Sequence, residues 1–333
     1  MNRLLRISVV GAVAFGVSGL VPGAASAEEL RDVLVDMIKT HKRMLAANAD
    51  VKKAEEDIEV AWGDWYPTLD MTANIGAEKQ QKPSVSDDTD MVPRKLETKI
   101  THKLWDFGST NSAIRRSKLT LGQQLATREA TRQTLVLEGV TAYLNVLRAN
   151  KLLNFAEGSA ANIKRQAELE DARVQRGSGF STDVLQAKTQ LAGALARVIQ
   201  SQGALKTARN RYFAVYGKLP EDIGKMKDPR LPLELLPISL ESTVEVVKKS
   251  NPQLTASRLS AAIAREDIIK TRADEFLPTF DVIAEHTAKK DESGTVGSQQ
   301  GALIKLEASY DLNLGFTAIN TLKASQQTHI ATV

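Results

Sequence analysis

Apolar and polar residues alternate in four short stretches of the chain, and this pattern predicts four β-strands with one apolar face each. The stretches begin near Thr68, Lys95, Thr279 and Ile304, and each is about ten residues long, enough to cross a membrane as a tilted strand. The fourth is the most regular and is expected to run to Leu314. In the first and fourth stretches, the residues expected on the apolar face are Leu69, Met71, Ile75, Ile304, Leu306, Tyr310 and Leu312.

Longer stretches between the strands carry apolar residues at helical spacing. Leu30–Ala61 is predicted to be helical, with a break near Thr40. A second helix is predicted to start at Ser109 or Thr110, as N-cap, and to run without proline to about residue 176. Some 65 helical residues would be about 100 Å long, so we expect a coiled-coil partner.

That partner is predicted to follow directly. Arg176-Gly177-Ser178-Gly179-Phe180 has the composition of a tight turn, and a return helix is expected from Ser181 or Thr182 to near Gly217. The two helices would form a long antiparallel hairpin. The fold class predicted is therefore α+β and mostly α, with a helical hairpin and four amphipathic strands.

A repeat organises these elements. Pro67-Thr68-Leu69-Asp70 returns as Pro278-Thr279-Phe280-Asp281, and the two prolines lie 278 − 67 = 211 residues apart. The same offset pairs Val33 with Val244 and Ile58 with Ile269, which indicates a duplicated unit. We expect a first repeat over residues 28–217, a proline-rich linker over 218–238 and a second, incomplete repeat over 239–333.

The first 27 residues read as a secretory signal peptide, with Arg3 and Arg6, an apolar run and Ala25-Ser26-Ala27 as the cleavage site. The chain has no cysteine, which excludes disulfides and thiolate chemistry, and its net charge of +4 gives no basic patch for nucleic acid. The four histidines show no metal-ligand spacing. We predict an exported protein without cofactor, metal site or catalytic residues, and not an enzyme.

Strands with one apolar and one polar face suit either of two settings. They could be surface hairpins on a soluble core, but no separate core is evident in the sequence for them to cover. In a membrane β-barrel, each strand turns an apolar face towards lipid and a polar face towards water. Because four strands cannot close a barrel, several copies of the chain would have to contribute strands.

The chain resembles the TolC-type outer-membrane efflux protein family. The resemblance rests on motifs in family order, and these cover nearly all of the mature chain. They are the duplicated Pro-Thr-x-Asp strand starts, Leu104-Trp105-Asp106-Phe107-Gly108, Thr141-Ala142-Tyr143-Leu144-Asn145-Val146-Leu147, the helix turn from Arg176 to Ala187 and Tyr310-Asp311-Leu312-Asn313-Leu314-Gly315.

The resemblance implies a homotrimer in the cell outer membrane, with a twelve-stranded barrel and a periplasmic helical tunnel. It implies passive export, by type I protein secretion or small-molecule efflux, with a periplasmic adaptor (membrane fusion) protein and an inner-membrane ABC or RND-type transporter. By the same resemblance, Gly177, Ser178, Gly179 and Phe180 would form the adaptor-docking tip, and Asp183 would lie near the periplasmic entrance. Asp183 could instead be only a favourable charge in the first helical turn.

One departure from the family pattern changes the expectation. A second long hairpin follows the fourth strand in the family, whereas this sequence stops at Val333. The interpretation is a fragment or a truncated gene, and the alternatives are a non-conducting remnant that assembles with an intact paralogue, or a soluble periplasmic coiled-coil scaffold. The sequence does not identify the cargo.

Overall fold

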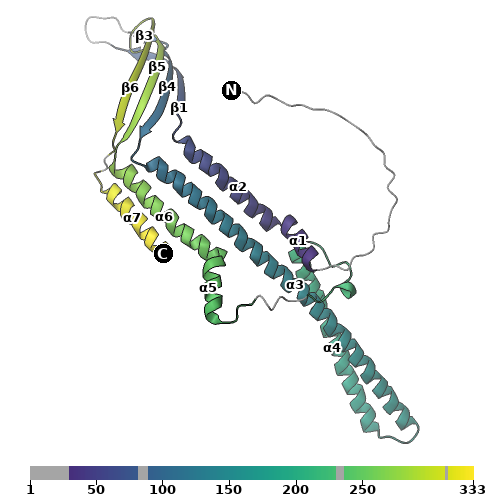
Figure 1. Ribbon diagram of the computed structural model, residues 1–333. Coiled ribbons are helices and arrows are strands. Elements are labelled where there is room, and N and C mark those ends of the chain that lie inside the picture. Colours follow the sequence, from purple (N-terminus) through teal and green to yellow (C-terminus); the bar gives the residue numbers. More distant parts are fainter. Residues whose placement is uncertain (1–29, 82–88, 230–235, 312–313) are drawn as a thin grey trace, which may run out of the picture.

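The computed structural model describes residues 30–81, 89–229, 236–311 and 314–333. The predicted signal peptide, part of the predicted linker and Leu312 lie outside these residues. The described chain is mostly helical, with an antiparallel sheet at one end and a helical hairpin at the other (Figure 1). The proposed division at residues 28–217, 218–238 and 239–333 stays a prediction.

The predicted helices are present. The break expected near Thr40 separates the first two, and His41 caps the second by accepting the N–H of Arg43 at 3.1 Å. None of the described helices is both long enough and apolar enough to cross a membrane. Their bounds are α1 Leu30–Thr40, α2 Lys42–Gly63, α3 Ser109–Gln175, α4 Ser181–Tyr216, the short 3₁₀ helix η1 Ile223–Lys225, α5 Leu240–Ser250, α6 Pro252–Phe276 and α7 Thr317–Thr332.

The main sheet contains the four predicted strands, in the order β1-β4-β5-β6, and every neighbouring pair is antiparallel. The strands are β1 Thr68–Ile75, β4 Arg94–Trp105, β5 Thr279–Lys290 and β6 Ser298–Ser309. Strands β4 and β5 join the two halves of the chain, and β1 and β6 form the edges. Helices α2, α3, α6 and α7 continue from the strand ends and lie side by side in the same order (Figure 1).

Three details differ from the sequence prediction. The fourth strand ends at Ser309 instead of Leu314, so Tyr310 lies just beyond it. Two short strands that were not among the four predicted, β2 Glu78–Gln80 and β3 Thr89–Met91, pair in a small separate hairpin. The fourth strand also begins earlier than expected, at Ser298 instead of near Ile304, and its first residue pairs with Lys290.

The core lies midway along the molecule, where α1 packs against α3 and α4. Tyr143, Val146 and Tyr212 are completely buried there beside Val33. The Tyr143 hydroxyl donates to the carbonyl oxygen of Lys227 at 3.0 Å, which attaches the segment after α4 to the same core. Apolar burial is therefore concentrated at one level of a long molecule, away from the sheet.

The start of α3 is also different from the prediction. Neither Ser109 nor Thr110 is the N-cap; this position is Gly108, in the left-handed region at φ 92°. The carboxylate of Asp106, 2 % exposed, accepts the N–H of Gly108 at 3.1 Å and the N–H of Thr110 at 2.8 Å. Each carboxylate oxygen accepts one of these N–H groups, so a single side chain satisfies two backbone donors.

The surroundings of Asp106 lower its pKa. Burial acts to raise it, but the hydrogen bonds from Thr110 and Gly108 and the nearby ammonium of Lys103 outweigh burial. A carboxyl group with a lowered pKa in the folded state stabilises the fold above its unfolded pKa of about 3.9. That contribution disappears as the pH falls through the folded value.

We predict that Asp106→Ala lowers the free energy of unfolding by about 1–2 kcal/mol at pH 7, the usual cost of losing a helix cap. The difference from wild type should shrink as the pH falls below about 4, since protonation removes the same contribution from the wild-type protein. Denaturant titrations of the detergent-solubilised protein at several pH values measure it. A difference that stays constant over this range would contradict the assignment.

Candidate membrane face and helical tip

The sheet has one apolar face, formed by residues in register across all four strands. Leu69 lies opposite Ile100, Ile100 opposite Ala284 and Ala284 opposite Ile304, so one row crosses the sheet without a polar residue. Residues directly opposite each other point to the same side. We call this surface the apolar face; its larger members are Leu69, Met71, Ile75, Leu96, Ile100, Ile304 and Leu306.

The opposite face is charged, and in its central part opposite charges face each other across the strands. Asp70 lies opposite Lys99, which lies opposite Glu285. The ammonium of Lys305 lies 2.6 Å from a carboxylate oxygen of Glu307 and 3.9 Å from one of Glu285. These opposite charges lie close together, whereas like charges face each other where Lys95 lies opposite Lys289 and Asp281 opposite Glu307.

The apolar face is uncovered in the single chain. Met71 is 65 % exposed, Ile75 72 % and Leu306 67 %. Thr98 and His286 interrupt the row of Met71, but the face is largely apolar, and an exposed apolar surface of this kind marks a contact with lipid or with another protein. Strands of twelve residues span about 40 Å at 3.3 Å per residue, enough to cross a bilayer when tilted.

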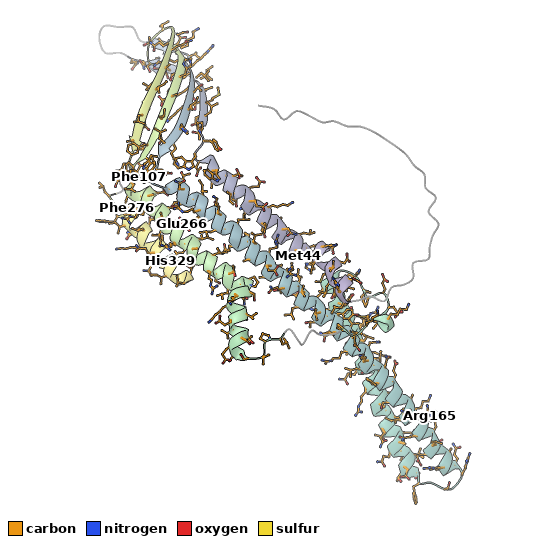
Figure 2. All side chains as sticks on the ribbon, in the orientation of Figure 1. Met44, Phe107, Arg165, Glu266, Phe276 and His329 are labelled. Atoms are coloured by element: carbon orange, nitrogen blue, oxygen red, sulfur yellow. The ribbon has the colours of Figure 1, made fainter. Side chains whose placement is uncertain are left out.

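Aromatic residues collect where the strands meet the helices, a feature the sequence analysis missed. The ring centroids of Trp105 and Phe107 are 6.0 Å apart, and those of Phe107 and Phe280 are 6.3 Å apart. Phe276, at the end of α6, lies at the same level (Figure 2). Aromatic girdles border the apolar band of membrane barrels at the water interface. Trp105 and Phe107 are far in sequence from Phe276 and Phe280, so only the fold brings the two pairs together.

The charged face also holds an unexpected apolar residue. Ile283 alternates with the apolar residues of β5 and therefore points to the charged side, where it lies opposite Thr101 and Lys305. It is 2 % exposed, the most buried side chain of the four strands. The alternation of β5 is consequently less strict than that of β6.

At the other end of the molecule, the α3–α4 turn is a Schellman motif. Gly177 has φ 76°, its N–H donates to the carbonyl of Val174 at 2.9 Å, and the N–H of Ser178 donates to that of Arg173 at 3.0 Å. A Cβ on Gly179 would come within 3.1 Å of the Val174 side chain. The turn thus favours glycine at position 177 by its backbone conformation, and a side chain at position 179 would crowd Val174. Phe180 follows with 76 % of its surface exposed.

Asp183 is exposed in the first turn of α4. It therefore lies close to the turn formed by Gly177, Ser178, Gly179 and Phe180, at the same end of the hairpin. The neighbouring ion pair is between Lys188 of α4 and Asp171 of α3, at 3.3 Å, and it ties the two helices together near the tip. The roles of the tip residues and of Asp183 stay predictions.

Within the described residues, no three histidine, aspartate or glutamate side chains are grouped as a metal site would require. The histidines have separate structural positions. His41 caps α2, His329 contacts the carbonyl of Ala261 at 3.1 Å, and His102 and His286 lie in β4 and β5. The two-faced sheet and the helical tip are therefore the features to compare with known proteins.

The sequence profile described as outer membrane efflux protein matches residues 33–218, more than half of the chain. The chain belongs to the outer membrane efflux protein family. The resemblance predicted from sequence is confirmed, and so are the outer-membrane localisation and the expectation that the protein is not an enzyme, since members of this family are channels.

Individual relatives support the same family assignment. The outer membrane protein TolC of Escherichia coli K12 is 26% identical over 302 residues, which cover 91% of this chain and 59% of that protein. The alkaline protease secretion protein AprF of Pseudomonas aeruginosa is 25% identical and covers 68% of this chain and 47% of its own length. The chain thus spans less than two thirds of the curated relatives it matches.

A solved structure supports the fold. The outer-membrane channel OprN superposes with a TM-score of 0.77 at 21% identity, and the match covers 91% of this chain and 68% of OprN. The predicted fold class, a mostly helical chain with antiparallel strands and a long hairpin, is confirmed.

We predict that Leu306→Lys prevents stable membrane insertion, whereas Lys305→Leu, one residue away on the charged face, is much better tolerated. A lysine facing lipid near the bilayer midplane costs about 2–4 kcal/mol. Heat-modifiable migration and resistance to protease in isolated outer membranes would measure insertion. Equal tolerance of the two substitutions would mean that the apolar face does not meet lipid.

Proposed function

We propose that this chain is a subunit of an outer-membrane channel that gives passive export through a periplasmic helical tunnel. The observation that carries the proposal is one sheet with an apolar and a charged face, open at both edges and continuous with a long helical hairpin. A sheet of this kind meets both solvents of a membrane pore, lipid outside and water inside.

The sheet needs further copies to function in a membrane. In hydrocarbon every backbone N–H and C=O must be paired, and β1 and β6 each have one neighbour among the described strands. Since the four strands alternate in direction, β6 of one copy can pair antiparallel with β1 of the next. Three copies would give twelve strands, whereas about eight close a barrel whose interior is filled with side chains. A homotrimer leaves room for water along the charged face.

The tip of the hairpin supplies a docking surface for a periplasmic adaptor (membrane fusion) protein. Phe180 is held on a tight turn with 76 % of its surface exposed, and aromatic residues, Phe included, are enriched at protein interfaces. An inner-membrane ABC or RND-type transporter would supply the energy and the cargo. A relative is named for protease secretion, so proteins as well as small molecules are candidate cargo.

Subcellular fractionation distinguishes this function from a periplasmic coiled-coil scaffold. After expression in a Gram-negative host that lacks its own efflux channel, we expect the protein in the outer-membrane fraction, released only by detergent. We also expect partial recovery of resistance to an exported dye or antibiotic. Recovery of the protein in the osmotic-shock fluid would favour the scaffold. Correct insertion without any recovered export would favour a non-conducting remnant.

The docking role of the tip has a matched control in the same hairpin. Phe155 in α3 is 74 % exposed, nearly the same as Phe180, but lies away from the turn. We predict that Phe180→Ala weakens adaptor binding by roughly thirtyfold, the effect of losing an interface anchor worth about 2 kcal/mol, while Phe155→Ala changes it little. Co-purification with the cognate adaptor measures binding, and the amount of each variant in the outer membrane controls for assembly. Equal effects would remove the tip from the docking surface.

A further inference from the structure

We propose that the contact between neighbouring copies repeats, residue by residue, the contact that joins the two halves of one chain. This inference rests on the proposed ring of copies and specifies its seam. Within the chain, the halves meet where β4 pairs with β5 and where α3 packs against α6. In a ring, β6 and α7 of one copy would meet β1 and α2 of the next in the same way.

The structure fixes the correspondence between the halves. Thr68 of β1 corresponds to Thr279 of β5, 279 − 68 = 211 residues later. Thr68 pairs with Thr101, and Thr279 pairs with Ser309, so residues of β4 correspond to residues of β6 at 309 − 101 = 208.

The helices after these strands keep the second spacing. Helix α3 begins at Ser109 and α7 at Thr317, again 317 − 109 = 208 residues apart. Both helices follow an N-cap residue in the left-handed region, and the second residue of each is buried, Thr110 in α3 and Ala318 in α7.

Applying these spacings to the β4–β5 register gives the register of the seam. Thr98 lies opposite His286 within the chain, which places Leu306 opposite Ile75 of the neighbouring copy. In the same way, the pair Ile100 and Ala284 gives Ala308 opposite Ala73, and the pair Lys99 and Glu285 gives Glu307 opposite Asn74. Apolar residues then meet on the apolar face and polar residues on the charged face, so the seam continues both surfaces.

The helix contacts agree in part: the ion pair Arg116–Asp267 would correspond to Ala324 and Glu56 and is not repeated, but another ion pair is. Arg115 of α3 pairs with Glu266 of α6 at 2.9 Å. The corresponding residues are Lys323 of α7 and the neighbouring copy's Glu55, so the charges are kept although the residues differ. Both are exposed in the single chain.

A second helix contact changes on both sides at once. Gln123 donates to Ser260 at 2.6 Å within the chain, and the corresponding positions are Ala331 and Ala49. A polar pair is replaced by an apolar pair, so neither member would be left with an unsatisfied partner.

Disulfide trapping tests the seam, because the natural chain has no cysteine and every thiol is introduced. Three double variants probe it: Leu306→Cys with Ile75→Cys, Ala308→Cys with Ala73→Cys, and Glu307→Cys with Asn74→Cys. Neighbouring antiparallel pairs alternate between the two hydrogen-bonding geometries, so this set samples both. The intrachain pair Thr98→Cys with His286→Cys is the matched control for the first, and Leu306→Cys with Ala73→Cys or Ala77→Cys is displaced by two residues.

After oxidation in isolated outer membranes, we expect disulfide-linked dimers and trimers for at least one of the three predicted pairs, and little for the displaced pairs. Charge reversal adds a second readout. Lys323→Glu or Glu55→Lys alone should raise subunit dissociation in detergent about twofold to fivefold, and the double reversal should restore it.

The outcomes separate the two proposals. Membrane-inserted oligomers that cross-link only at displaced positions, or at none while the intrachain control forms, overturn the seam and leave the channel function intact. A protein found in the periplasm as a monomer overturns both.

Discussion

The requirement that every backbone amide be hydrogen-bonded inside a membrane governs this molecule. An unpaired N–H or C=O in hydrocarbon costs several kcal/mol, which no side chain of an edge strand recovers. Strands β4 and β5 have neighbours on both sides, but β1 and β6 close the sheet with a free edge each. In the proposed ring of copies, those edges would be joined, the apolar face would meet lipid and the charged face would meet water.

Helices α2, α3, α6 and α7 depend on the same sheet, because each continues from a strand end through a short connection. Asp106 is central to this arrangement. Its carboxylate lies between β4 and α3 and binds the first backbone donors of the longest helix, so it fixes where the strand ends and in which direction the helix leaves. The core around Tyr143 lies further along the same helix and orders α1 and α4 around it.

Much of the fold and of the apolar face could be predicted from the sequence, for identifiable reasons. The alternation around Leu306 predicted a two-faced strand, and the duplicated Pro67 and Pro278 predicted where helices give way to strands. Contacts between segments far apart in the sequence could not be predicted. Asp106 was missed as a cap because it precedes the helix by three residues, and the aromatic level around Phe107 is assembled from distant segments. Ile283 broke the alternation of its strand because neighbouring strands bury it, which a single stretch of sequence does not reveal.

The buried side chains of the α3–α4 hairpin are larger at the core level than towards the tip, and this difference has a mechanical consequence. Beyond the core level, the buried contacts of α3 and α4 come mostly from alanines, Ala160 and Ala167 on one helix and Ala194 on the other, with Val184 near the turn. Small side chains let two helices approach closely but bury little area, so this section resists bending less than the part braced by α1, α2 and α6. Force applied at the tip would therefore bend the outer hairpin, and little of it would be transmitted to the sheet.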